Sequence, residues 1–341
     1  MQFKLPYPRL LFMRPIVQSI TLAVTALCSA AGALTPSTSA GQTFPTKPIR
    51  IIVAFPAGGG TDIVARMIAP KLGEALGTQV VIDNRAGAQG VIGTELAAKS
   101  PPDGHTLFMG TLGNIAVNTV LYGNKLPFNI ERDFAPLTQV VDVWFVQIIH
   151  PSLPAKTPRE LIALAKSQPG ALNYYSSGAG GAPHLAAEMF NAFAGVRTTH
   201  VPYKGSAPAQ IDLMAGQVQL GYDSIVQSLP FIKAGKMRAL AVLGAKRTPL
   251  LPDAPAMSDY LPGFTLTNWF ALMLPAATPV EIRNRLHAEV VKILRSPEIR
   301  ERLLSMGAEP VGSTQEQFAA FIKSEVAKWG KVVRDANIKA E

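Results

Sequence analysis

IRIIVAFPAGGGTDIVAR, residues 49–66, is the stretch of sequence that decides the fold. Its first half is rich in β-branched residues and predicts a strand, the glycines at 58–60 predict a turn, and the apolar spacing over 63–76 predicts a helix. Glycines let backbone amides approach a ligand closely, and the first turn of a helix leaves several N–H groups without intrahelical partners. The junction therefore favours a bound anion, with Thr61 or Asp62 as the helix N-cap, although a purely structural turn would show the same pattern.

Two nucleotide-binding motifs look similar to this loop, but its residues exclude both. A Walker A loop requires lysine after its last glycine, and here Thr61 follows Gly60. A dinucleotide fingerprint requires G-x-G-x-x-G spacing, which three consecutive glycines do not provide. Neither class of nucleotide is therefore an expected ligand.

The first 40 residues have the pattern of an export signal. Three cations precede an apolar core at residues 16–27, and small residues near position 33 or 40 offer cleavage sites. The core is shorter than the roughly 20 residues of a membrane-spanning helix and contains polar side chains, which disfavours a retained anchor. Cys28, the only cysteine, lies in this segment. We therefore expect a soluble periplasmic chain without disulfides after cleavage.

Length and charge limit the classes of function. The chain has 341 residues, with 32 Lys and Arg against 23 Asp and Glu, and a net charge of +9. Without the three cations of the export signal the net charge is about +6, which suits anionic ligands. The cations are dispersed, and no basic run is interleaved with aromatic residues, so nucleic acid is not an expected partner. The roughly 300 residues that follow the export signal would ordinarily form two domains.

The pattern of strand, small polar turn and helix recurs along the chain. In the first half, turns at 83–90 and 110–114 follow apolar strands, as is typical of parallel strands covered on both faces. In the second half, a strand at 172–175 leads into the glycine turn 176–181 and a helix that starts near Pro183. Two such turns in separate halves predict a ligand held between two lobes, at the carboxyl ends of the strands.

Two long apolar stretches predict crossovers between the lobes. Residues 140–149 would lead from the first lobe to the second, and 264–274, with Trp269 as an anchor, would lead back. We therefore expect an α/β fold in which each lobe is a mostly parallel sheet flanked by helices, with the two crossover strands as the hinge. The expected division gives residues 41–145 plus 268–341 to lobe 1 and residues 146–267 to lobe 2.

Capping boxes predict three helix starts, at Thr157, Thr278 and Ser313, because Glu follows each of these residues three positions later. The second and third boxes belong to a group of three helices predicted after residue 278. Their apolar residues recur at helical spacing, which indicates packing and not chemistry.

No pattern of catalytic residues is evident. An enzyme needs a nucleophile with a base, a metal cluster or a cofactor motif. The five histidines are scattered without H-E-x-x-H spacing, so neither a metal nor a cofactor is expected. No G-x-S-x-G elbow surrounds Ser177. His184 could still act as its base, so an exported hydrolase stays open as an alternative to a binding protein.

Several short motifs together resemble the Bug receptors, the periplasmic solute-binding proteins of tripartite tricarboxylate transporters. They are FPAGGGTD at 55–62, DNRAG at 83–87, SSG at 176–178 with PHL at 183–185, VPYKG at 201–205 and NWF at 268–270. They occur in the family's order along essentially the whole chain after the export signal. The second turn departs from the family pattern, because Gln89 stands there in place of a glycine.

The resemblance implies a type II-like clamshell of the periplasmic binding protein class that closes on a small organic carboxylate. It implies that the loops at 56–62 and 176–181 hold the carboxylate through backbone amides, hydroxyls and bridging waters, without a cofactor. The implied partners are the acid and the subunits of an inner-membrane permease, and a monomer is expected.

Within this frame, the candidate ligand-binding residues come from the turns at the strand ends. They are Gly59, Gly60, Thr61, Asp62, Thr111, Asn114, Ser176, Ser177, Gly178, His184, Tyr203 and Asp223. No catalytic or metal-binding residue is expected. The alternatives are the exported hydrolase, acting on a carboxylated substrate, and a ligand-sensing protein that recruits a partner.

Overall fold

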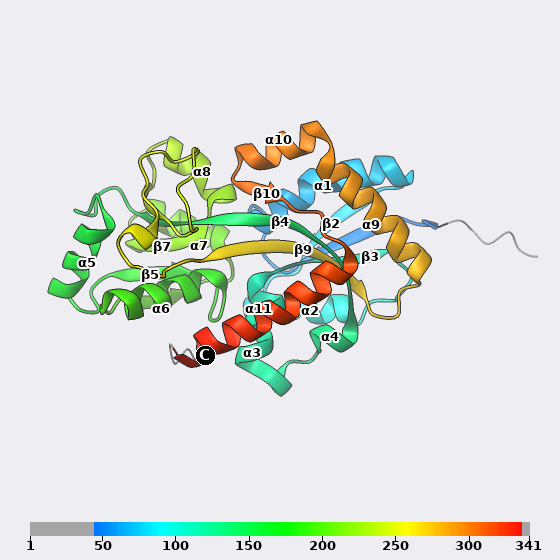
Figure 1. Cartoon of the computed structure of the whole chain (residues 1–341), viewed down its shortest axis with the longest axis horizontal. Helices are drawn as coiled ribbons and strands as arrows, with labels where there is room; N and C mark the ends of the chain where they lie inside the picture. Colours follow the sequence, from blue (N-terminus) through cyan, green and yellow to red (C-terminus); the bar gives the residue numbers. More distant parts are fainter. Residues whose placement is uncertain (1–43, 336–341) are drawn as a thin grey trace, which may run out of the picture. The chain divides into compact units, whose positions relative to one another are not determined.

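The structure, a computed structural model, describes residues 44–335, and Figure 1 labels most of their helices and strands. The predicted export signal at residues 1–40 lies outside the described residues. Within the described range, no helix is both long and apolar enough to cross a membrane.

Lobe 1 begins with alternating strands and helices. Its elements before the first crossover are β1 (Ile49–Val53), α1 (Gly60–Leu76), β2 (Val80–Asn84), η1 (Ala88–Gly90), α2 (Val91–Ala98), β3 (Thr106–Thr111), η2 (Gly113–Val117), α3 (Asn118–Tyr122), η3 (Gly123–Lys125) and α4 (Ile130–Asp133). β1 lies between β2 and β3 and is parallel to both. Ile51 of β1 packs in the cluster that contains α1, whereas Ile52 packs in the cluster that contains Ala97 of α2. Helices therefore cover both faces of this sheet, which explains its nearly continuous apolar strands.

Lobe 2 repeats this arrangement. Its elements are α5 (Pro158–Ser167), β5 (Asn173–Ser176), α6 (Ala182–Ala194), β6 (Thr199–Pro202), α7 (Ser206–Met214), β7 (Leu220–Ser224), α8 (Ile225–Lys233), β8 (Arg238–Val242) and η4 (Met257–Asp259). β5 lies between β6 and β7 and is parallel to both. The carboxyl ends of these strands lead into α6 and α7, so the turns that were predicted to bind a ligand share one edge of the sheet.

Two long strands connect the lobes. They are β4 (Phe134–Ile149) and β9 (Thr267–Pro275), which run side by side and antiparallel in Figure 1. The first part of β4 pairs with β9 and with β10 (Ala308–Pro310), and its last residues pair with β7 and β8. Among the described strands, the antiparallel pairings all involve β4 or β9. The predicted α/β fold of two lobes is confirmed, and the crossovers make each sheet mixed.

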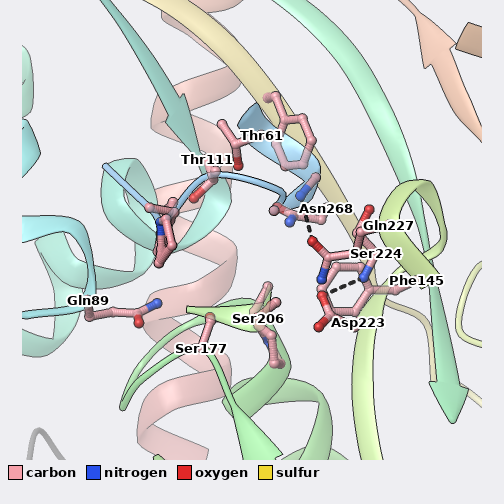
Figure 2. A pocket seen from close by; sticks show the side chains of 17 residues that line it. Thr61, Gln89, Thr111, Phe145, Ser177, Ser206, Asp223, Ser224, Gln227 and Asn268 are labelled. Carbon is pink, nitrogen blue, oxygen red and sulfur yellow. Dashed lines mark hydrogen bonds between the residues drawn. The ribbon is translucent and has the colours of Figure 1, made fainter. Parts of the chain in front are cut away.

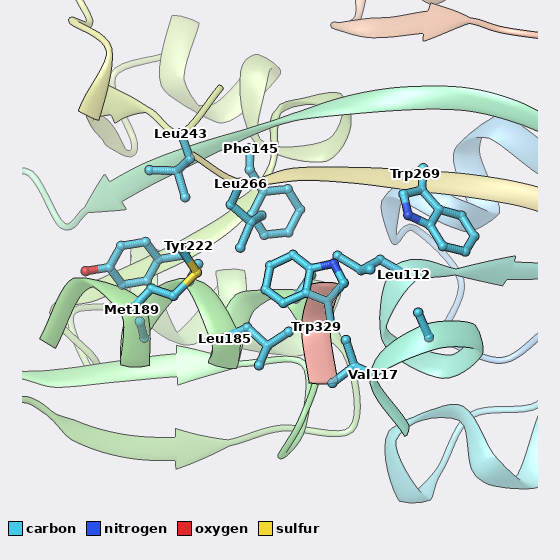
Figure 3. Packing of buried hydrophobic residues seen from close by; sticks show 14 of the residues in the cluster. Leu112, Val117, Phe145, Leu185, Met189, Tyr222, Leu243, Leu266, Trp269 and Trp329 are labelled. Atoms are coloured by element: carbon cyan, nitrogen blue, oxygen red, sulfur yellow. The ribbon is translucent and has the colours of Figure 1, made fainter. Parts of the chain in front are cut away.

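A large apolar cluster lies at the crossovers and includes side chains from both lobes (Figure 3). Leu112 and Leu185 belong to it, together with Trp269 of β9 and Trp329 of α11 (Gln315–Asp335). Both indole N–H groups donate to Oε2 of Glu325, each at 3.0 Å. Trp269 is therefore a buried anchor of the crossover, as predicted, and α11 is tied to β9.

The predicted capping boxes were correct at one helix and wrong at another. Thr157 caps α5, since its Oγ1 accepts from Glu160 N at 3.2 Å. Thr278 does not cap α9 (Val280–Arg295), because its hydroxyl donates to Pro275 O at 2.7 Å and the helix starts after Pro279 without a side-chain cap. A hydroxyl that bonds to a carbonyl of the preceding turn is not placed to cap the helix that follows.

The third capping box is shifted by one residue. Thr314 Oγ1 accepts from Gln317 N at 3.1 Å, and Gln317 Oε1 accepts from Thr314 N at 3.0 Å. The box therefore uses Thr314 and Gln317, and the predicted start at Ser313 was wrong. Ser313 Oγ instead accepts from Gln139 N of β4 at 2.9 Å, which fixes the chain ahead of α11 to the crossover strand.

We expect Glu325→Ala to lower the free energy of unfolding by about 2–4 kcal/mol, because it leaves two buried indole N–H groups without their acceptor. Glu325→Gln keeps an acceptor oxygen and should lose less. Urea unfolding followed by tryptophan fluorescence measures the change. The control is Glu301→Ala, an exposed position on α10 (Pro297–Ser305). Equal effects of the two alanine variants would contradict the anchoring role of Glu325.

Candidate ligand-binding site

α1, α6 and α7 each begin at a glycine N-cap and without a side-chain cap. The N-cap residues of α1, α6 and α7 are Gly59, Gly181 and Gly205, which have no side chain that could accept from the first-turn N–H groups. By contrast, Ser224 caps α8, since its Oγ accepts from Val226 N at 3.3 Å. A glycine N-cap leaves the backbone donors of the first turn to partners outside the helix.

These helix starts meet around one cavity between the lobes (Figure 2). Its polar side chains include Thr61, Thr111, Ser177, Ser206, Gln227 and Asn268. Its apolar wall includes Phe55, Pro56, Phe145 and Phe270. No Lys or Arg occurs among the described residues that line it. With a volume of about 50 Å³, the cavity holds only a few water-sized groups, so a compact solute suits it.

The α1 end of the cavity depends on close approach between the lobes. Gly60 N donates to Oε1 of Gln227, which belongs to α8 of lobe 2, at 2.5 Å. A Cβ at Gly60 would lie 3.1 Å from Ser224 Oγ and 3.4 Å from the ring of Phe270. A larger residue at this position would therefore push lobe 2 away from the start of α1.

Asp62 supports this turn from behind and does not line the cavity. Its Oδ2 accepts from Gly58 N at 2.9 Å, and Asn84 Nδ2 and the Arg66 guanidinium donate to the same carboxylate. Burial would raise the pKa of Asp62, but hydrogen bonds from Arg66, Gly58 N and Asn84 outweigh it and hold the pKa below its ordinary value. The prediction that Thr61 or Asp62 is the N-cap was wrong, because the helix begins at Gly60 and Asp62 bonds back across the turn.

The glycine turn of lobe 2 has a comparable internal support. Ser176 Oγ accepts from Gly178 N at 3.0 Å and lies 2.6 Å from His200 Nε2. His184 Nδ1 accepts from Gly180 N at 2.9 Å, and its ring stacks on that of His200 at a centroid distance of 4.3 Å. Ser176, Gly178 and His184 therefore shape the turn from behind and do not line the cavity.

Two further candidates also lie outside the lining. Asn114 Oδ1 accepts from Thr111 N at 2.7 Å, so Asn114 fixes the end of β3. The Tyr203 hydroxyl donates to Asp212 at 2.6 Å. Burial and the Asp212 carboxylate raise the pKa of Tyr203 to about 12, which keeps the phenol protonated.

The remaining candidates are brought together at the cavity. Gly59, Gly60, Thr61, Thr111, Ser177 and Asp223 all line it. Sequence reasoning did not select Gln89, Ser206, Ser224, Gln227 and Asn268, which line it as well. Ser206 and Ser224 had a detectable signal, since each stands where the chain passes from a strand to a helix. No sequence pattern indicated Gln227, because it lies inside α8 and reaches the cavity only through the approach of the two lobes.

Asp223 is the acidic side chain of the cavity (Figure 2). The Tyr175 hydroxyl donates to its Oδ2 at 2.9 Å, and Ser224 N donates to its Oδ1 at 2.8 Å. Burial raises the pKa of Asp223 to about 6, although hydrogen bonds from Ser206, Ser224 N, Tyr175 and Gln227 oppose the increase. The cavity thus combines helix starts that attract an anion with a carboxyl group that readily takes up a proton.

Metal coordination is not indicated in the described part of the chain. Over residues 44–335, no group of three or more His, Cys, Asp or Glu side chains is placed to hold a metal ion.

The sequence matches one family description over most of its length. The "Tripartite tricarboxylate transporter family receptor" description covers residues 64–338. Protein BugT of Bordetella pertussis is 37% identical over 320 residues, which cover 93% of this chain and 98% of BugT.

Solved structures show the same similarity. Rpa4515 of R. palustris, solved with adipate, is 37% identical with a TM-score of 0.85, and the match covers 87% of this chain and 99% of that one. MatC (Rpa3494) from Rhodopseudomonas palustris, with bound malate, is 31% identical with a TM-score of 0.81, over 85% of this chain and 100% of that one.

Protonation of Asp223 should stabilise the fold as the pH falls. A carboxyl whose pKa is higher in the folded than in the unfolded chain binds its proton more tightly when folded. With a pKa of about 6 against 3.8, Asp223 should add on the order of 1 kcal/mol to the free energy of unfolding between pH 8 and pH 5. This contribution is complete below pH 3.8 and is lost as the pH rises through 6.

Asp223→Asn should remove that contribution. Asp142, whose pKa burial and Glu309 raise to about 6, adds a similar contribution that persists in the variant and in the wild type. Urea unfolding of both proteins at pH 5 and pH 8 measures the difference. An identical pH dependence of the two proteins would show that Asp223 does not titrate as described.

Proposed function

The chain belongs to the tripartite tricarboxylate transporter family of receptors, and we propose that its cavity captures a small organic carboxylate. The observation that carries the proposal is the meeting of the uncapped starts of α1, α6 and α7 at one cavity between two lobes. Backbone N–H groups and the positive ends of helix dipoles stabilise a carboxylate there without a Lys or Arg partner. The family match and the similarity to BugT confirm the resemblance to the Bug receptors at the level of the family.

Two related structures support the class of ligand. Rpa4515 was solved with adipate and MatC with malate, and both are dicarboxylates. The hydroxyls of Thr61, Thr111, Ser177 and Ser206 supply additional donors around the cavity, directly or through bridging waters. Asp223 would repel an ionised acid, so we infer that it is protonated in the complex or accepts a hydrogen bond from a ligand hydroxyl.

We propose that the lobes close on the acid by bending at the crossovers. The proposed division, 41–145 plus 268–341 against 146–267, is supported by the change of partners along β4. Val143 pairs with β10 of lobe 1, whereas Phe145 pairs with Ser224 of lobe 2. Closure would exclude water from the cavity and so strengthen the contacts between helix starts and acid.

Delivery of the acid to an inner-membrane permease follows from the family and is part of the proposal, as is export to the periplasm after signal cleavage. We propose a monomer in which no residue acts catalytically. A hydrolase would use Ser177, which lines the cavity, with His184 as its base, but the His184 ring is engaged with the turn. Nδ1 of His184 already accepts from Gly180 N and helps to shape the turn.

The ligand class can be tested by titrating the protein without its export signal with di- and tricarboxylates, aromatic acids and acidic amino acids in a calorimeter. At least one acid should bind stoichiometrically and without conversion to a product. Heat from sugars or cations with silence across the acids would contradict the proposal, and product formation that Ser177→Ala abolishes would establish the hydrolase instead.

Thr61→Val should weaken the binding of the preferred acid about tenfold to a hundredfold, because a hydrogen bond to a charged group contributes about 1.5–3 kcal/mol. Ser177→Ala should act in the same direction from the other lobe. Calorimetry gives both dissociation constants. The matched control is Thr119→Val, whose hydroxyl donates to Ile115 O inside lobe 1. A loss of affinity in Thr119→Val as large as in Thr61→Val would rule out a specific contact.

A further inference from the structure

Gln89 has a backbone conformation that residues with a side chain rarely adopt. Its φ is 51° and its ψ is 39°, and the preceding Ala88 also has a positive φ of 44°. Positive φ costs free energy wherever a Cβ is present, and such strain is typical of positions where the side chain has a specific task. Asn118 supports this conformation, since its Nδ2 donates to Gln89 O at 3.1 Å.

The side chain of Gln89 crosses from lobe 1 to the glycine turn of lobe 2 (Figure 2). With the amide oriented to satisfy both neighbours, its nitrogen donates to Ser177 O at 2.8 Å and its oxygen accepts from Gly181 N at 3.0 Å. Gly178 O shares the same Gly181 N–H at 3.2 Å. Because Gly181 is the N-cap of α6, a carbonyl oxygen from lobe 1 stands at the start of that helix.

The glycine turn is shaped around this amide. A Cβ at Gly178 or at Gly181 would collide with the terminal amide of Gln89. Gln89 is 8% exposed, and its contacts with the turn, at 2.8 Å and 3.0 Å, are direct hydrogen bonds. An oxygen that accepts from a helix-start N–H makes the contact that a ligand carboxylate would make there. Gln89 therefore competes with a ligand for the α6 end of the cavity.

At the α1 end of the cavity, a single replacement would not test one contact alone. Gln227 of lobe 2 makes the reciprocal contact with Gly60 N at the start of α1. Gln227 also influences the pKa of Asp223, so its replacement would change two properties of the site together. Gln89 contacts the backbone of the glycine turn, and its replacement changes only the α6 end.

We propose that Gln89 selects ligands by length, because its amide takes up the α6 end of the cavity and leaves room for a compact acid only. This inference rests on the proposed carboxylate-binding function. A glycine at position 89 would adopt the positive φ without strain and remove the amide. Gly181 N would then be accessible to the second carboxylate of a longer diacid.

The test compares malonate, succinate, glutarate and adipate, which differ in length by one methylene each, in calorimetric titrations of wild type, Q89G and Q89N. The adipate-to-malonate affinity ratio should rise about tenfold or more in Q89G, since the variant gains both room and a hydrogen bond to a charged group. Asn tolerates positive φ and is one methylene shorter, so Q89N should shift the ratio in the same direction.

Gln219→Ala is the matched control. Gln219 Oε1 accepts from Asn173 N at 2.9 Å, and Gln219 directly precedes β7, whose opposite end carries Asp223. This variant should keep the wild-type ratio. An unchanged ratio in Q89G and Q89N, with binding intact, overturns the inference and leaves the receptor function standing. If wild type and both variants bind none of the acids of the broader panel, the receptor proposal and this inference fall together.

Discussion

Helix starts without side-chain caps are the constraint on which the rest of the site depends. Buried backbone donors must find a partner, and glycine N-caps provide none from within the turn. In α1 and α6 the partner comes from the other lobe, through Gln227 and Gln89. The same donors suit a carboxylate, so the feature that joins the lobes is also the feature that we propose recognises the ligand. In this proposal, closure and binding are coupled by one set of backbone groups.

The turns can present these donors because other residues hold them from behind. Asp62 accepts from Gly58 N in lobe 1, and Ser176 accepts from Gly178 N in lobe 2. Neither side chain lines the cavity, yet each fixes a glycine of the turn that leads into the helix start. At the crossovers, Glu325 joins Trp269 of β9 to Trp329 of α11. Packing at the crossovers and support behind each turn together place the donors around one cavity.

Local patterns were sufficient to predict the fold. The β-branched run, the glycines and the helical spacing at residues 49–66 located β1 and α1, and the same pattern located β5 and α6. Helix caps were less predictable, because a hydroxyl such as that of Thr278 has a competing carbonyl nearby that only the folded turn reveals. The short strand β10 escaped detection, since it is defined by its pairing with β4 and not by its own residues.

The site was only partly predictable for the same reason. Ser177 directly follows β5, Asp223 lies at the end of β7, and Thr61 stands in the first turn of α1, so their place at a sheet edge could be foreseen. Gln227 is part of a helix pattern, and its approach to Gly60 arises from the packing of two lobes that are far apart in sequence. His184 and Ser176 were reasonable choices by residue type. The structure gives them supporting contacts within the turn, a distinction that residue type alone does not contain.

The most direct measurement is a crystal structure of the protein saturated with the dicarboxylate that binds most tightly. We expect a carboxylate whose oxygens lie about 3 Å from the first-turn N–H groups of α1, beside the Thr61 hydroxyl and between the two lobes. An acid bound elsewhere on the molecule, or in the cavity with its carboxylates directed away from the helix starts, would contradict it.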